Sequence, residues 1–384
     1  MTSASPARST AGPSQNRYCA LLGNGASIAY NPDLSIPALT AGLVAKFEGL
    51  GGVDVQGALS AYAHGLSGTN PDDFERLLAP IEHAARGLPA LAGLVGLAGS
   101  AQAHVGQALS TTRAFMLDVH RMGMGIALGL IADRTHGRGE VVHDTTVIAV
   151  AEALLALGPV GRVTVATLNY DGLLHSGMLN SAPSNEVCDL SDGREDDKLR
   201  VVSGQPELSC RLLRSTDDLP TPRTAIVQLH GSLGWLRDRE RPDRVRKFNI
   251  EDLRAVRYWD ALRDGRALMD PVVILTDQKV REAAGWPFGL AYDIFQDRLR
   301  QASRWLVAGY GFGDEPVASA MNLAYQHHHD RGALRLLVVD FEKPADEVRK
   351  LARDATGLPG SQIDVDTTGI PACLSGEPWQ AWAA

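Results

Sequence analysis

Short runs of apolar and β-branched residues recur along the chain, and each stops abruptly at glycine or polar residues. Continuous apolar runs of about four to eight residues with such boundaries are typical of strands buried on both faces of a sheet. Helix-like stretches separate these runs, which favours a mostly parallel sheet. The pattern therefore predicts an α/β fold, a Rossmann-like mostly parallel sheet with helices on both faces, whose buried strands include Tyr18–Leu22, Val163–Ala166, Thr224–Leu229, Pro271–Thr276, Trp305–Ala308 and Leu336–Val339.

A long stretch between the first two strands, residues 40–158, is rich in Ala, Leu and Gly at helical spacing. The run Pro71–Leu78 places acids in a first helical turn ahead of apolar positions three and four residues apart. Two further helices are predicted over Ala114–Ile131 and Asp144–Leu157, so we expect residues 40–158 to form a helical insertion or subdomain. Its histidines show no metal-ligand spacing and are predicted to be solvated or to cap helices: His64, His83, His104, His120, His136 and His143.

Polar side chains stand where two of the predicted strands end. Asn169 and Asp171 follow one strand, and His230 follows another. In an open α/β sheet ligands bind at the carboxyl ends of the parallel strands, so these residues are candidates for the floor of an active site. Asn and Asp are also ordinary turn and helix-capping residues, and a lone histidine is usually structural, so the pattern by itself leaves both interpretations open.

Glycine-rich loops follow two other strands. The loop with Gly23, Gly25, Ala26 and Ser27 comes after the first strand, where dinucleotide-binding folds place their phosphate loop at a helix N-terminus. The second loop contains Gly309 and Gly311 and would lie against a ribose or adenine. Asp340, at the end of a further strand, would accept a hydrogen bond from a ribose hydroxyl. These three residues complete the candidate cofactor-binding set. A bare G-x-G also fits any tight turn.

Two charged stretches are predicted to be solvated surface. Residues 180–222 are polar and contain a loop-like run of acids that includes Asp189. The stretch Arg237–Lys247 is basic, with acids interleaved. Charge runs of this kind usually face water.

Composition narrows the class of protein. The 384 residues suit one large domain or two smaller ones, and their net charge of −8 argues against direct nucleic-acid binding. The four cysteines, Cys19, Cys188, Cys210 and Cys373, are far apart in the sequence. This spacing argues against a zinc site and a disulfide framework, and it favours a cytoplasmic location. The sequence contains no run of about 18 apolar residues, so no membrane span is predicted. Residues 1–16 are rich in Ser, Ala, Pro and Gly and are predicted to be disordered.

An ordered set of motifs resembles the sirtuin-like family, in particular its bacterial branch of antiphage defence proteins. The matching segments span most of the chain and are Gly23–Ser27, Ile36-Pro37, Phe74-Glu75, Thr167–Asp171, Leu229–Ser232, Lys279–Tyr292 and Gly309–Asp314. Two departures stand out. The paired cysteines of the deacylase zinc module are missing, and Ala38-Leu39-Thr40 replaces the family's Asp-Phe-Arg. Deacylation is therefore less expected than cleavage of NAD itself.

This resemblance implies that residues 17–384 form a sirtuin-like NAD-binding catalytic domain. Asn169 would orient a water or the ribose hydroxyls near C1′, His230 would act as a general base, and Asp171 would lie near the nicotinamide carboxamide or fix the loop. The glycine loop with Ser27 would hold the diphosphate. The expected activity is an NAD glycohydrolase that depletes NAD on infection.

The resemblance also implies assembly. Such an activity must be restrained in a healthy cell, and we expect a homo-oligomer or a separate defence subunit such as an ATPase or helicase. Two alternatives stay open at the level of sequence. One is an NAD-dependent ADP-ribosyltransferase or deacylase that uses the same site, and the other is a non-catalytic component that binds NAD or ADP-ribose.

Overall fold

The computed structural model describes residues 16–51, 57, 73–97, 103–136, 144–158, 162–182, 186–191, 197–213, 224–275 and 279–384. Residues 1–15, most of the predicted disordered segment, lie outside this description, whereas Asn16 begins the first strand. The predicted α/β class is confirmed by a seven-stranded sheet in which every pairing is parallel. Its strands, in spatial order, are β12 (Ile363–Asp366), β11 (Arg335–Val339), β10 (Arg304–Ala308), β1 (Asn16–Leu22), β2 (Arg162–Thr167), β6 (Thr224–Gln228) and β3 (Val187–Cys188).

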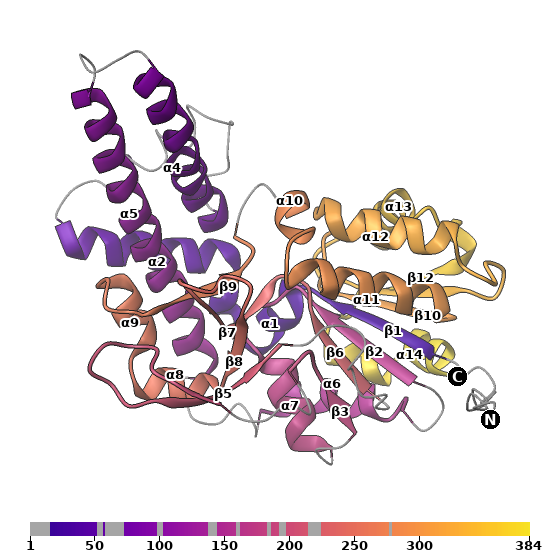
Figure 1. The fold of residues 1–384 in the computed structure, drawn as a ribbon. Coiled ribbons are helices and arrows are strands. Elements are labelled where there is room, and N and C mark those ends of the chain that lie inside the picture. Colours follow the sequence, from indigo (N-terminus) through magenta and orange to yellow (C-terminus); the bar gives the residue numbers. More distant parts are fainter. Residues whose placement is uncertain are drawn as a thin grey trace, which may run out of the picture.

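Helices cover both faces of this sheet (Figure 1). Alternate residues of β1 explain why: Cys19 and Leu21 enter one apolar core, and Tyr18, Ala20 and Leu22 enter the other. The first core is closed by α11 (Phe288–Gln301), α12 (Glu315–Gln326) and α13 (Ala345–Thr356). The second is closed by α6 (Thr145–Leu155), α7 (Leu173–Ser181) and α14 (Glu377–Ala383). A parallel sheet needs this double cover because both of its faces are apolar.

A second, five-stranded antiparallel sheet was not anticipated from the sequence. Its order is β4 (Asp197–Leu199), β5 (Leu208–Leu212), β8 (Val245–Phe248), β7 (Gly231–Asp238) and β9 (Met269–Val273), with α8 (Ile250–Ala255) and α9 (Tyr258–Arg263) between β8 and β9. The run Pro271–Thr276, predicted as a strand of the main sheet, instead contributes to β9. An apolar run reports burial, and burial is equally available in either sheet.

The predicted helical insertion is helical wherever it is described. It contains α2 (Ile36–Gly51), α4 (Phe74–Leu97) and α5 (Ala103–Thr135), and α4 and α5 project side by side from the body (Figure 1). Its last helix, α6, packs on the parallel sheet, so the helices that stand apart from that sheet end at Thr135. The remaining short elements are α1 (Asn24–Tyr30), α10 (Lys279–Ala283), η1 (Pro32–Leu34), η5 (Gly360–Gln362) and η6 (Ala372–Ser375).

Within the described residues, α5 is the one helix long and apolar enough to cross a membrane, over His104–Thr135. Half of its most apolar window is buried inside the protein. Its apolar residues, among them Leu128, Ile131 and Ala132, belong to the core that joins the insertion to the antiparallel sheet. These contacts are compatible with the central helix of a soluble protein.

The prediction of solvated surface was wrong for Asp189 and for the end of the basic stretch at Val245–Lys247, whereas Arg239–Arg244 is exposed as predicted. Asp189 is 2 % exposed, and its carboxylate accepts a hydrogen bond from the Lys247 ammonium on β8. The ring of His175 on α7 lies 3.6 Å from the same carboxylate. Burial by itself would raise the pKa of Asp189, but the Lys247 charge holds it well below its usual value. The ion pair joins β8 of the antiparallel sheet to the segment that follows β3, and His175 brings α7 into contact with the same carboxylate.

Candidate active site

The strand order places a crevice at the carboxyl ends of β1 and β10. The chain leaves β1 toward β2 and β6 on one side and later returns to β10 on the other, so the connections diverge at this point. Open α/β sheets bind ligands at such a switch point. A cavity of ≈ 560 Å³ lies here, between the strand ends and helices α4 and α10. The candidate residues Asn169, Asp171, His230, Gly309 and Gly311 all line it.

The two glycine loops pack directly against each other. A Cβ on Gly23 would lie 2.5 Å from the Gly309 carbonyl oxygen, and a Cβ on Gly25 would lie 2.6 Å from the Gly309 Cα. The N–H groups of Gly23, Gly25 and Ala26 donate to backbone carbonyls at 2.9, 2.9 and 3.0 Å. These N–H groups are therefore committed within the fold, and the expected diphosphate contact through them is not available in this conformation. By contrast, a Cβ on Gly311 would meet nothing within 4 Å, so the cavity is open beside it.

Asn169 and Asp171 fix the end of β2 to the first glycine loop. The Asn169 amide donates to the Gly23 carbonyl oxygen at 3.0 Å and to the Ser27 hydroxyl at 2.8 Å. The Ser27 hydroxyl in turn donates to the Asp171 carboxylate, which also accepts from the Leu173 N–H at 2.9 Å. Burial raises the pKa of Asp171, and these hydrogen bonds oppose the rise. Ser27 and Asp171 thus form a hydrogen-bonded brace that fixes the orientation of the Asn169 amide.

His230 ends the neighbouring strand β6 and is paired with Asp314. Its Nε2 lies 3.2 Å from Asp314 Oδ2, outside strict hydrogen-bond alignment, and both side chains are at least 94 % buried. Burial alone would raise the pKa of Asp314, but His230 and Lys279 hold it below its usual value. An ionised carboxylate at Nε2 favours the tautomer that carries a proton there and leaves Nδ1 as the acceptor. This is the arrangement that a general base requires.

A further charged cluster completes the wall of the cavity. The Lys279 ammonium on α10 lies 3.2 Å from Glu75 Oε2 on α4 and 3.4 Å from Asp314 Oδ2. The Tyr170 hydroxyl lies 2.7 Å from Glu75 Oε1 and from the Ile274 carbonyl oxygen. Sequence reasoning assigned no role to these four residues. Glu75, Tyr170, Lys279 and Asp314 do occur in the segments that carry the family resemblance, but no local pattern shows that they meet.

Five predicted site residues do not line this cavity: Gly23, Gly25, Ala26, Ser27 and Asp340. Asp340, at the end of β11, does not line the cavity, and its carboxylate instead accepts the N–H groups of Glu342 and Lys343 at 2.7 and 3.1 Å in a turn. Ser27 lines a separate small cavity of ≈ 40 Å³ behind Asn169. Across the described ranges, no group of three or more His, Cys, Asp or Glu side chains is placed to hold a metal ion.

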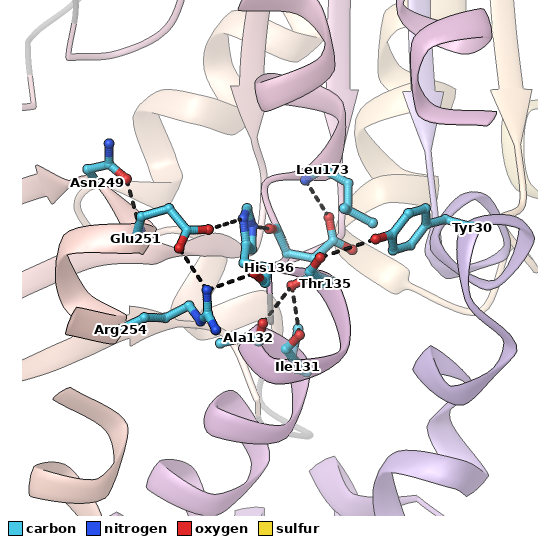
Figure 2. A network of polar contacts seen from close by, with 10 residues as sticks. Tyr30, Ile131, Ala132, Thr135, His136, Leu173, Asn249, Glu251 and Arg254 are labelled. Carbon is cyan, nitrogen blue, oxygen red and sulfur yellow. Dashed lines mark hydrogen bonds and ion pairs between the residues drawn. The ribbon is translucent and has the colours of Figure 1, made fainter. Parts of the chain in front are cut away.

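His136, predicted to be solvated or capping, is buried beneath the site (Figure 2). Its Nε2 lies 2.8 Å from the Asp171 carbonyl oxygen, and its Nδ1 lies 3.4 Å from Glu251 Oε1. Arg254 on α8 joins the network by donating to the His136 carbonyl oxygen at 2.7 Å and to Glu251 at 2.7 Å. The end of α5, the Asp171 loop and α8 are thereby tied together under the cavity.

The turn after His230 depends on a glycine, which leads to a test of the fold near the site. Gly231 has φ +86°, and a Cβ there would lie 2.0 Å from the Val272 carbonyl oxygen. Gly204 has a similar φ of +76° but open space around it. We expect Gly231→Ala to lower the free energy of unfolding by about 2–4 kcal/mol and Gly204→Ala by about 1 kcal/mol. Urea denaturation of both variants measures the difference, and equal losses would contradict the predicted clash.

Comparison with known proteins adds no relative. No protein-family model matches this chain, and no curated protein matches its sequence.

Proposed function

We propose that this protein is an NAD glycohydrolase, which converts NAD to nicotinamide and ADP-ribose. The observation that carries the proposal is the cavity at the switch point of the parallel sheet, where Asn169 and the His230–Asp314 pair meet from neighbouring strands. Its volume of ≈ 560 Å³ falls within the range of about 300–1,000 Å³ typical of small-molecule sites. The family resemblance of the motifs supports the choice of NAD.

The proposed reaction breaks the bond between the nicotinamide nitrogen and ribose C1′. The bonding electrons leave with nicotinamide, and C1′ develops the character of an oxocarbenium ion. Water then bonds to C1′ and loses a proton to His230 Nδ1, while Asp314 stabilises the imidazolium that forms. Asn169 would orient the water or the ribose hydroxyls. The brace of Ser27 and Asp171 holds that amide in place, so less ordering is needed when the substrate binds.

The adenosine and diphosphate half of NAD would extend along the open side of the cavity beside Gly311, where backbone can approach a ligand closely. Gly309 would keep its structural role in the packed loops. We further propose that the protein acts in the cytoplasm as an NAD-depleting effector of antiphage defence, held inactive until a homo-oligomer or a complex with an ATPase or helicase subunit assembles.

The direct test is nicotinamide release from NAD by purified wild type and Asn169→Ala, each alone and with any partner encoded beside it. We expect the variant to lose at least about 100-fold in kcat because the substrate's reacting carbon is no longer positioned. Asn322→Ala on α12, outside the cavity lining, is the matched control and should keep wild-type turnover. Circular dichroism confirms that each variant is folded.

The other outcomes separate the alternatives. Transfer of ADP-ribose to protein, or removal of an acyl group from a peptide, with little free ADP-ribose would favour the transferase or deacylase. Tight NAD binding without turnover in every assembly would favour the non-catalytic component and overturn the hydrolase.

A further inference from the structure

The cavity contains a carboxylate that comes from the helical insertion and has no part in the reaction so far. Glu75 is in the first turn of α4, close to Asp73, whose carboxylate accepts the Glu75 N–H at 3.0 Å and fixes the helix start. The Glu75 side chain is 15 % exposed and lines the cavity opposite the strand ends. It is held on two sides, by the Tyr170 hydroxyl at 2.7 Å and by the Lys279 ammonium at 3.2 Å.

The charges around Glu75 do not balance. Lys279 is the shared partner of two carboxylates, Glu75 and Asp314. Burial would lower the pKa of Lys279, but these two neighbours raise it above its usual value, so the ammonium stays charged. Burial and Glu75 raise the pKa of Tyr170 well above its usual value, so its hydroxyl stays neutral. Two carboxylates thus share one ammonium, so Glu75, Asp314 and Lys279 together carry one net negative charge.

The net negative charge of this cluster matches the substrate at its reacting end. The nicotinamide ring of NAD is a pyridinium cation, and as the glycosidic bond breaks the positive charge moves onto C1′ and the ribose ring oxygen. A carboxylate facing that charge stabilises the transition state, because Tyr170 and Lys279 already hold it in position and no reorganisation is needed.

Of the two carboxylates, Glu75 is the better placed to meet this charge. Asp314 is 5 % exposed, is engaged by His230 and caps α12 by accepting the Val317 N–H at 3.2 Å. Glu75 is the more exposed of the two and makes no contact with His230. Tyr170 adjoins Asn169 in sequence, and its hydroxyl donates to Glu75. The same loop therefore positions both the Asn169 amide and the Glu75 carboxylate.

We propose that Glu75 is a further catalytic residue, whose carboxylate faces ribose C1′ and the ring oxygen, where positive charge develops only as the bond to nicotinamide breaks. This inference rests on the proposed glycohydrolase function. It makes the site composite: the parallel sheet supplies Asn169 and His230, and the arm of α4 and α5 supplies the charge. A displacement of α4 would remove Glu75 from the cavity without disturbing the sheet.

The test is Glu75→Gln, which keeps an oxygen acceptor for the Tyr170 hydroxyl, removes the charge and replaces the oxygen that faces Lys279 by an amide NH2. Steady-state nicotinamide release should show kcat lowered by about 100-fold and KM changed by less than about threefold, the signature of an interaction made in the transition state. Glu82→Gln is the matched control, since Glu82 is on the same helix, is 19 % exposed and is paired with Arg86 away from the cavity lining. It should keep wild-type kinetics.

A purely structural role predicts different results. If Glu75 served only to anchor Tyr170, Tyr170→Phe would lower kcat as much as Glu75→Gln, and we expect it to lower kcat by less than about tenfold. Active wild type together with a Glu75→Gln variant within threefold of its kcat would overturn this inference and leave the proposed function standing. Wild type that releases no nicotinamide in any assembly would overturn both.

Discussion

Replacing His230 by alanine is expected to lower kcat for nicotinamide release by about 10²- to 10⁴-fold, the usual contribution of a general base. The imidazole is buried at the end of β6 and its Nε2 lies 3.2 Å from Asp314 Oδ2, so its orientation is fixed before substrate arrives. Alanine leaves no group to accept the proton of the attacking water. The measurement is single-turnover hydrolysis of NAD by wild type and variant at matched protein concentration.

A second substitution separates the base from its support. Asp314→Asn keeps the shape of the side chain but removes the charge that stabilises the imidazolium, and we expect kcat to fall. The control is His327→Ala, whose exposed ring follows α12 and lies 2.9 Å from the Leu323 carbonyl oxygen, outside the cavity lining. Full activity of His230→Ala, with wild-type activity in the control, would show that His230 is structural.

The largest effect on stability is expected from Lys247→Met. Methionine fills a similar volume but leaves the fully buried Asp189 carboxylate without its cation, and removing one partner of a buried pair costs about 3–5 kcal/mol. The neighbouring His175 only partly replaces the lost charge, because burial, the largest of the causes that lower its pKa to about 4 in the wild type, remains in the variant. Lys198→Met, at an exposed position on β4 of the same sheet, is the control and should change the free energy of unfolding by less than about 0.5 kcal/mol.

The pH dependence of this effect has a defined sign. In the wild type the folded-state pKa of Asp189 is below its unfolded value of 3.8. The Asp189–Lys247 pair therefore stabilises the fold fully above pH 3.8, and this stabilisation is lost as the pH falls from 3.8 through the folded-state pKa. Without Lys247, burial is left to raise that pKa, so protonation relieves the variant as the pH is lowered. The gap between variant and wild type should therefore narrow from pH 7 to pH 4 in urea denaturation. A constant gap would mean that Lys247 acts by packing alone.

The composite nature of the site also gives the helical arm a definite place in the proposed mechanism. Glu75 begins α4, and the end of α5 reaches the Asp171 loop through His136. An assembly that moves or clamps α4 and α5 would act on both the charge in the cavity and the loop that bears Asn169. Self-association or a partner subunit could restrain the proposed activity through these contacts.

The sequence by itself determined the class of the fold and the side chains at the strand ends. Strands such as Val163–Ala166 and Trp305–Ala308 could be predicted because a strand buried on both faces must be apolar throughout, which is a local property of the chain. Asn169, Asp171 and His230 could be predicted because they end such runs, and all three line one cavity. Glycine spacing located the two loops at the switch point, although it gave no sign that the N–H groups of the first loop donate to backbone carbonyl oxygens.

Only the tertiary structure decided which distant residues meet. The run at Pro271 is buried like the others, but its partner is β7 of the antiparallel sheet, and pairing is not encoded in an apolar run. Glu75 and Lys279 are more than 200 residues apart and become an ion pair only when α4 and α10 close over the strand ends. Asp189 looks like a solvated acid until β8 brings Lys247 to it. A charged residue gives the same local pattern whether it faces water or a partner, because its environment is set by long-range packing.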